Sequence, residues 1–176
     1  MTADLGAFAG TALAVVFAGA AAGKLQDLDG FRHALAGYGF LPAWGLGPLV
    51  ALVPGAEAAC AGLLVSGATR PVGGVAALAL LAAFTAALAP AVIRGTQIDC
   101  GCFGGGGGPE RASWTSIARN GVLASLAAIA VTAARGAGAA PAALSGVGVG
   151  IGLLVTDRAL ALFREHWLRP EEAVIR

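Results

Sequence analysis

Five long apolar segments set the limits on how this chain can fold. A helix needs about 20 mainly apolar residues to cross the hydrocarbon core of a bilayer, and each segment is close to that length. Only 12% of the 176 residues are charged, against about 25% in soluble domains. The sequence therefore predicts an all-α polytopic membrane helix bundle. The approximate segments are Leu5–Gly23, Leu46–Gly67, Pro71–Ile93, Trp114–Ala134 and Ala137–Thr156.

The same segments suggest how the chain is divided. We expect residues 5–135 to form a membrane domain of four core transmembrane helices, residues 136–156 to add a fifth transmembrane helix, and residues 157–176 to form a charged tail. Spacings such as Gly146 with Gly150 suit close helix packing in lipid. A chain with 28 glycines contains such spacings by chance, so we give them little weight. We expect a multi-pass protein of the cell membrane, surrounded by lipid.

The connection between the first two segments contains an amphipathic pattern. Leu28, Phe31, Leu35 and Tyr38 recur at spacings of three and four residues. This periodicity is typical of a helix with one apolar face, and such a helix is suited to lie at the membrane surface.

The charges exclude one class of partner and leave the orientation open. The net charge is +1, so the chain has no basic field for nucleic acid. Lys and Arg are concentrated in the connections after the first and third segments and in the C-terminal tail, which the positive-inside rule would place in the cytoplasm. The second of these connections also carries two cysteines, and disulfides persist mainly outside the cytoplasm. The side that this connection faces therefore stays undecided.

Two cysteines separated by one residue are the main candidate for chemistry. Cys100 and Cys102 lie in the polar connection before Trp114. A disulfide across one residue closes a small, strained ring, and strain makes the bond easier to reduce. Gly101 tolerates the backbone angles of such a ring, whereas the charge of Asp99 would disfavour a nearby thiolate. The third cysteine, Cys60, lies in an apolar segment and is expected to be buried and inert.

The cysteine pair has two other interpretations, a metal site and an incidental pair of loop cysteines. Zinc sites commonly space their thiolates as C-x₂₋₄-C and need four ligands. Here the spacing is shorter and no second pair follows, so we assign no metal ligand. The pair could also be two incidental cysteines of a loop, which we favour less.

Glu57 is the second candidate because it lies near the middle of an apolar segment. An unpaired charge at the bilayer centre costs about 3 kcal/mol, so the carboxylate is expected to face the bundle and to pair. Lys24, at the end of the first segment, and Arg119, early in the fourth, are the expected partners. A structural clasp between helices is favoured over a proton acceptor coupled to thiol oxidation.

At these residues the chain resembles the MauE family of methylamine utilisation proteins, which is related to DoxX-like membrane proteins. The resemblance covers roughly residues 10–135, and its most specific part is the cysteine block. The matching pieces are Ala21-Ala22-Gly23-Lys24-Leu25, Phe31…Tyr38…Leu41-Pro42, Val53-Pro54…Glu57…Gly62-Leu63-Leu64, Arg94-Gly95…Asp99-Cys100-Gly101-Cys102-Phe103-Gly104 and Arg119-Asn120.

The resemblance implies an integral membrane protein that acts beside a thioredoxin-like partner in maturing the disulfide-rich small subunit of methylamine dehydrogenase. It implies that Cys100 and Cys102 form the catalytic redox pair. The supporting positions are Lys24, Glu57, Asp99, Gly101 and Arg119.

The leading hypothesis is therefore a redox-associated membrane protein whose cysteine pair exchanges a disulfide with a thioredoxin-like protein. Whether it is an enzyme, a thiol–disulfide oxidoreductase, stays open. A quinone could accept the electrons, by analogy of architecture with other four-helix membrane proteins that generate disulfides. The alternatives are a non-catalytic membrane scaffold or assembly factor and, less favoured, a metal-handling membrane protein.

Overall fold

The computed structural model describes residues 1–39, 42–95, 113–133 and 140–167, with the side chains of Ala43 and of residues 157–167 left aside. In these ranges the regular secondary structure is entirely α-helical. The cysteine block from Asp99 to Gly104 lies outside the described residues. The helices are α1 (Thr2–Gln26), α2 (Leu28–Gly37), α3 (Ala43–Val65), α4 (Arg70–Arg94), α5 (Trp114–Thr132) and α6 (Ala140–Trp167).

Local sequence signals explain where several helices begin and end. The Asp27 side chain accepts a hydrogen bond of 2.8 Å from the Gly30 backbone N–H and so caps α2, satisfying a donor at the helix start. Proline occupies the first turn of α4, where its missing N–H costs nothing. Gly95 ends α4 with φ of 66°, a left-handed conformation that glycine adopts without a Cβ clash. Capping residues, proline and glycine thus mark where these helices begin and end.

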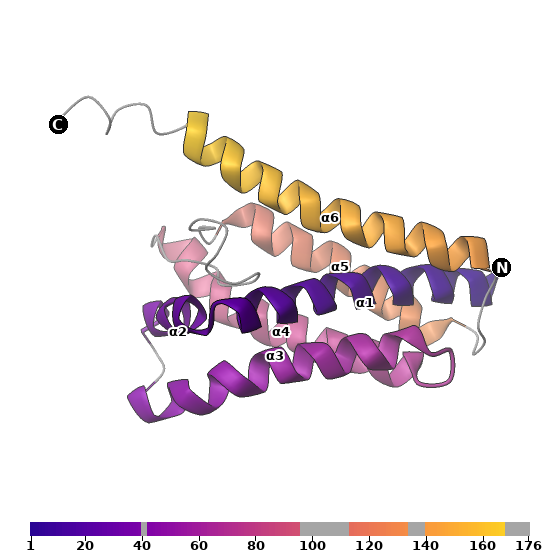
Figure 1. The fold of residues 1–176 in the computed structure, drawn as a ribbon, viewed down its shortest axis with the longest axis horizontal. Coiled ribbons are helices and arrows are strands. Elements are labelled where there is room, and N and C mark those ends of the chain that lie inside the picture. Colours follow the sequence, from indigo (N-terminus) through magenta and orange to yellow (C-terminus); the bar gives the residue numbers. More distant parts are fainter. Residues whose placement is uncertain (40–41, 96–112, 134–139, 168–176) are drawn as a thin grey trace.

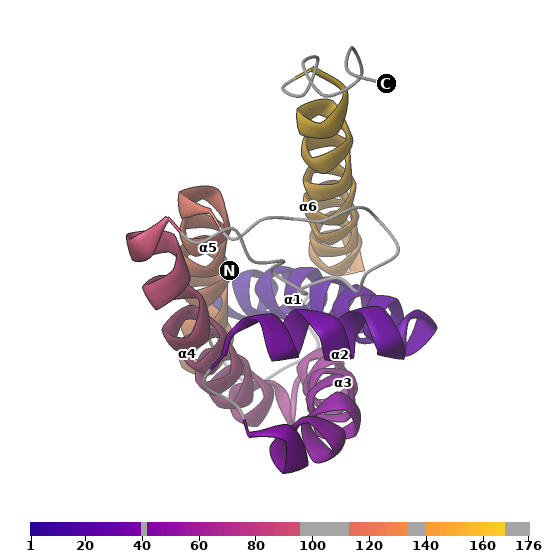
Figure 2. The same cartoon turned by 90° about the vertical axis from the view of Figure 1, so that its left-hand side faces the viewer.

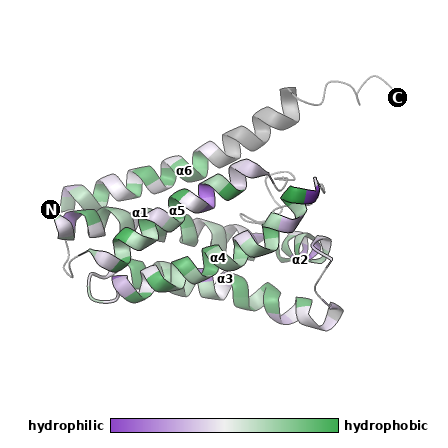
Figure 3. Cartoon of the chain, turned by 180° about the vertical axis from the view of Figure 1, so that it is seen from behind, coloured by the Kyte–Doolittle hydropathy of each residue, from purple (hydrophilic) through white to green (hydrophobic). Residues whose placement is uncertain are grey.

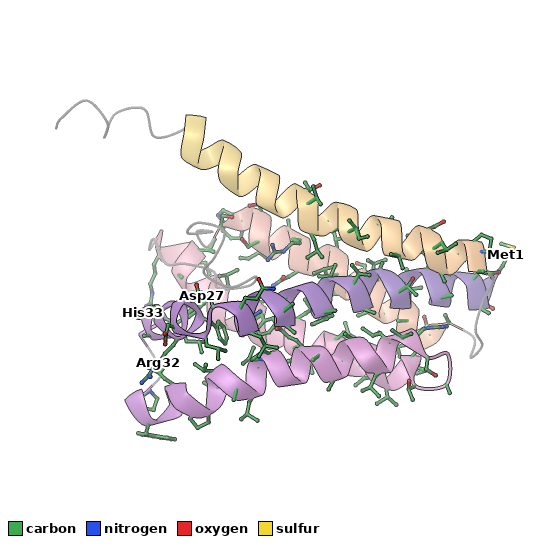
Figure 4. All side chains as sticks on the ribbon, in the orientation of Figure 1. Met1, Asp27, Arg32 and His33 are labelled. Atoms are coloured by element: carbon green, nitrogen blue, oxygen red, sulfur yellow. The ribbon has the colours of Figure 1, made fainter. Side chains whose placement is uncertain are left out.

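The long helices run up and down between two ends of the bundle (Figure 1). One end, which we call the α2 end, holds the C-terminal ends of α1 and α4, the N-terminal ends of α3 and α5, and α2 itself. The side chains of Asp27, Arg32 and His33 lie there, whereas Met1 marks the opposite end (Figure 4). A view onto the α2 end shows α2 lying across the bundle in front of α1 and α3 (Figure 2).

α1 is the central helix of the bundle. Inside the bundle, 61% of its most apolar stretch is buried, against 28% for α3, 22% for α4 and 28% for α5. It packs against α3, α5 and α6, while α4 packs against α3 and α5. Leu13 and Phe17 of α1 meet Leu64, Leu81 and Leu123 in one apolar core.

The outer surface is apolar, which identifies the molecule as a multi-pass membrane protein. α1, α4, α5 and the Trp44–Val65 part of α3 are each long and apolar enough to cross a membrane. Large apolar side chains such as Leu52, Val75 and Val122 are exposed on them, and Figure 3 shows hydrophobic colour along α3, α4 and α5. Such a surface suits lipid rather than water. The predicted all-α polytopic bundle and the multi-pass location are confirmed.

α6 packs on α1 through two glycines whose spacing had been given little weight. A Cβ on Gly146 would collide with the Thr11 side chain and the Phe8 carbonyl, and one on Gly150 would lie 2.7 Å from the Ala12 carbonyl. The Thr11 hydroxyl also donates a 3.0 Å hydrogen bond to the Ala143 carbonyl. The spacing is therefore a true helix contact of the small-residue type.

α6 does not settle whether the C-terminal part divides into a fifth transmembrane helix and a charged tail, as predicted. α6 continues without interruption to Trp167, through the expected boundary between helix and tail. Its described apolar stretch, Ala140–Thr156, is shorter than the four spans. The fifth transmembrane helix and the charged tail therefore stay predictions.

The first prediction concerns this contact. Gly146→Leu should lower the free energy of unfolding by about 1–3 kcal/mol, because the added side chain must push α6 off α1. Gly148→Leu is the matched control, since nothing lies within 4 Å of a Cβ at that position. Equilibrium unfolding in mixed detergent would measure both variants. Equal stability of the two variants would contradict the glycine-mediated contact.

Candidate functional site

The central feature of the site is an ion pair buried inside the bundle. The Lys24 Nζ atom lies 2.8 Å from Oε1 and 3.1 Å from Oε2 of Glu57. The side chains are 2% and 1% exposed. Lys24 comes from the last turn of α1, and Glu57 from α3. The pairing expected from the sequence is present, and its bidentate geometry lets the two charges stabilise each other away from water.

The direction of helical side chains explains how a residue at a helix end becomes buried. A lysine near the end of a transmembrane helix commonly extends its ammonium group toward the membrane surface. Side chains on a helix, however, point back toward its N-terminus. From the last turn of α1 that direction leads into the bundle, where Glu57 lies.

Two phenylalanines enclose the ammonium group. The Lys24 Nζ atom lies 5.5 Å from the centre of the Phe31 ring and 5.8 Å from that of Phe84, within range of cation–π attraction. Phe31 belongs to α2 and is only 4% exposed. Phe31, which belongs to the amphipathic pattern predicted from the sequence, thus covers the ion pair at the α2 end.

Polar side chains of α4 and α5 extend the site. The Asn120 Nδ2 atom donates a 3.1 Å hydrogen bond to the Thr85 hydroxyl. Arg119, the neighbour of Asn120, lines a cavity of about 30 Å³ together with Asn120, Glu57 and Phe84. The cavity lies between α1, α3, α4 and α5, and its polar lining residues come from α3 and α5.

The structure thus brings some predicted site residues together and leaves others undescribed. Lys24 and Glu57 are in contact, and Arg119 borders the same cavity as Glu57. Asp99, Cys100, Gly101 and Cys102 lie outside the described residues. The roles assigned to all seven residues stay predictions. Gly95 and Ser113, which flank the undescribed segment, both lie at the α2 end.

Cys60 is buried, as expected. It is 1% exposed in the apolar core, and its thiol donates to the Gly73 carbonyl over 3.4 Å. Among the described residues no group of three or more His, Cys, Asp or Glu side chains could hold a metal ion.

Two features of the polar framework were missed from the sequence. Thr85 is the lone polar residue between Val72 and Ile93, a signal that could have pointed to a buried hydrogen bond. Arg70 directly precedes the third predicted segment, Pro71–Ile93, yet it is 3% exposed and lies against α1. Its position directly before a proline indicates a helix start and says nothing about burial.

The fold and this site define the class: a multi-pass membrane helix bundle with a buried intramembrane ion pair. The family model described as methylamine utilisation protein MauE matches residues 2–133. The chain therefore belongs to the MauE family.

Curated relatives agree with this assignment. The chain is 43% identical over 117 residues to the methylamine utilization protein MauE of Paracoccus denitrificans, a match covering 65% of this chain and 62% of that protein. It is 40% identical to the MauE protein of Paracoccus versutus over 65% of this chain and 62% of that protein. The MauE protein of Methylophilus methylotrophus is 40% identical over 54% of this chain and 50% of that protein. The chain thus aligns with less than two thirds of these relatives' length. No solved structure matches it.

Proposed function

We propose that this protein has a MauE-type role in methylamine utilisation and that Cys100 and Cys102 exchange a disulfide with a thioredoxin-like partner. The observation that carries the proposal is the Cys-Gly-Cys sequence within residues 2–133, the range that the family model matches. Two thiols one residue apart can interconvert between dithiol and disulfide, and little else in the chain offers redox chemistry.

The exchange needs only the two proteins. In one direction, a thiolate of the cysteine pair attacks the partner's disulfide, and one partner sulfur leaves as a thiolate and takes up the proton. The second cysteine then attacks the mixed disulfide, which closes the Cys100–Cys102 bond and releases the partner as a dithiol. The pair loses two electrons and the partner gains them. The reverse direction uses the same steps in the opposite order.

The buried ion pair supports this proposal because it lies toward the end of the bundle that carries the cysteine segment. That segment is attached at Gly95 and Ser113, both at the α2 end. Lys24 and Glu57 form their contact between α1 and α3 beneath α2 at the same end. In this proposal they are supporting residues that keep the helices at the attachment end in register. The client that the family resemblance implies is the small subunit of methylamine dehydrogenase.

The second prediction tests the exchange through its covalent intermediate. Cys100→Ser or Cys102→Ser should accumulate a mixed disulfide with the partner, because the cysteine that would resolve it is missing. Affinity purification with thiols blocked by alkylation, followed by non-reducing electrophoresis and mass spectrometry, would detect the adduct and identify its cysteine. Cys60→Ser is the matched control and should accumulate none, since Cys60 is buried in the core.

The same experiment distinguishes disulfide exchange from the alternative, a non-catalytic scaffold. A scaffold whose cysteines only staple a loop would form no adduct in either single variant, and the double variant would merely lower the amount of protein. That result would contradict the proposed exchange.

A further inference from the structure

The hydrogen-bonding capacity of Glu57 and Asn120 exceeds what the described residues use. An ionised carboxylate has about four acceptor sites, and among the described residues Lys24 alone donates to Glu57, with two contacts. The Asn120 side chain has two donors and a carbonyl acceptor. In the described part of the chain its only hydrogen bond is the donation to Thr85. Both side chains are buried.

Glu57 and Asn120 each make hydrogen bonds in the described part of the chain, and both keep sites for a further one. Lipid offers no partner for these sites, so a polar ligand inside the bundle is what could fill them. Glu57 and Asn120 come from different helices, α3 and α5, and line the same cavity. A ligand between them would therefore satisfy both.

The size of the cavity limits what that ligand is. Its volume of about 30 Å³ is far below the 300–1,000 Å³ of ordinary small-molecule sites. A buried water needs about 10–15 Å³ and two to four polar partners. Most of the lining is apolar, but Glu57 offers acceptors and Asn120 offers both a donor and an acceptor, which gives a water two polar partners.

We propose that this cavity is a hydration site that holds on the order of two water molecules and connects the Glu57 carboxylate to the Asn120 amide. The Lys24–Glu57 ion pair is then dry on the side that Phe31 covers and wet on the side that faces α5. A dry clasp can only hold helices together. A hydrated carboxylate can also exchange a proton with solvent through the bound water.

The third prediction follows from comparing buried leucines that differ in contact with the cavity. Leu81 and Leu123 line the cavity, whereas Leu13 and Leu64 belong to the same core without lining it. A brief X-ray pulse makes hydroxyl radicals from any water, and these radicals oxidise the side chains beside that water. Mass spectrometry of the whole protein in detergent should find Leu81 and Leu123 oxidised severalfold more than Leu13 and Leu64. Equal oxidation of the two sets would overturn the hydration site.

A variant of Asn120 tests whether its amide binds the proposed water. Asn120→Leu removes one partner, and oxidation of Leu81 and Leu123 should fall to the level of Leu13. Ser116→Ala is the control, because Ser116 is buried on the same helix but does not line the cavity. Unchanged oxidation in Asn120→Leu would overturn the part given to Asn120. If that variant does not fold, the difference in oxidation between the two sets of leucines in the native chain still decides whether the cavity holds water.

Discussion

Glu57→Gln is expected to lower the free energy of unfolding by about 3–5 kcal/mol, because it leaves a charged lysine buried without its carboxylate. Both side chains are at most 2% exposed, so bulk solvent cannot replace the lost carboxylate. The Phe31 and Phe84 rings near the ammonium group offer only weak compensation, about 2 kcal/mol when fully desolvated. Equilibrium unfolding in mixed detergent, followed by tryptophan fluorescence, would measure the loss.

The double variant Lys24→Met/Glu57→Leu distinguishes the loss of a charge from the loss of the pair. Replacing a whole buried ion pair by apolar residues of similar volume is often neutral or stabilising by about 1–4 kcal/mol. We therefore expect the double variant to unfold at a free energy close to that of the native chain. A double variant as unstable as Glu57→Gln would show that the pair itself, rather than the uncompensated charge, holds the bundle together.

An exposed ion pair in the same chain supplies the control. The Met1 amino group lies 2.9 Å from the Asp4 carboxylate, with side chains 103% and 41% exposed. Exposed pairs contribute about 0–1 kcal/mol, so Asp4→Asn should have little effect. A Glu57→Gln loss no larger than this would mean that Lys24 finds water or lipid headgroups, and the buried clasp would be refuted.

The double variant also separates stability from chemistry. If Lys24 and Glu57 act only as a clasp, a stable double variant should still accumulate the mixed disulfide when combined with Cys100→Ser or Cys102→Ser. Loss of the adduct from a folded double variant would mean that the ion pair also takes part in the exchange.

Much of the fold could be predicted because segment length and hydropathy largely determine a membrane bundle. The first predicted segment, Leu5–Gly23, is the centre of α1, and the amphipathic pattern around Phe31 became α2. The charge on Glu57 could be paired in advance because an isolated charge in the bilayer is so costly.

The helix contacts and the shared polar region could not be predicted, because they depend on which helices face each other. Gly146 and Gly150 became informative only when α1 lay opposite them, since close approach is a property of two surfaces. For the same reason the polar region formed by Glu57, Thr85 and Asn120 was not expected as a unit, because its members come from three helices. The chemistry predicted for Cys100 and Cys102 is in a segment that the structure leaves undescribed, so it remains a sequence prediction.

The end of the bundle opposite α2 depends on a second buried charge, Arg70. Its guanidinium lies against the face of α1 formed by Gly6 and Gly10, because a Cβ on Gly6 would be 3.0 Å from Nη1 and one on Gly10 would be 2.9 Å from Nε. The Leu64 carbonyl, in the last turn of α3, would be 2.8 Å from the same Gly10 Cβ. Gly10 thus leaves the space in which α1, the end of α3 and Arg70 meet.

Gly10→Leu is therefore expected to lower the free energy of unfolding by about 3 kcal/mol or more, the upper part of the range for an overpacked core. One of the clashing atoms is a backbone carbonyl, so relief requires α1 to move away from α3 rather than a side chain to rotate. Gly55→Leu, on the outer face of α3 with nothing within 4 Å of a Cβ there, should instead be neutral or slightly stabilising, since leucine exceeds glycine in helix propensity by somewhat under 1 kcal/mol. The two variants add the same side chain to core helices of one bundle, so opposite signs in one unfolding experiment would attribute the loss to the contact of Gly10 with Leu64 and Arg70. A common sign would mean that leucine at any glycine perturbs the bundle, and the glycine face would then have no special part in burying Arg70.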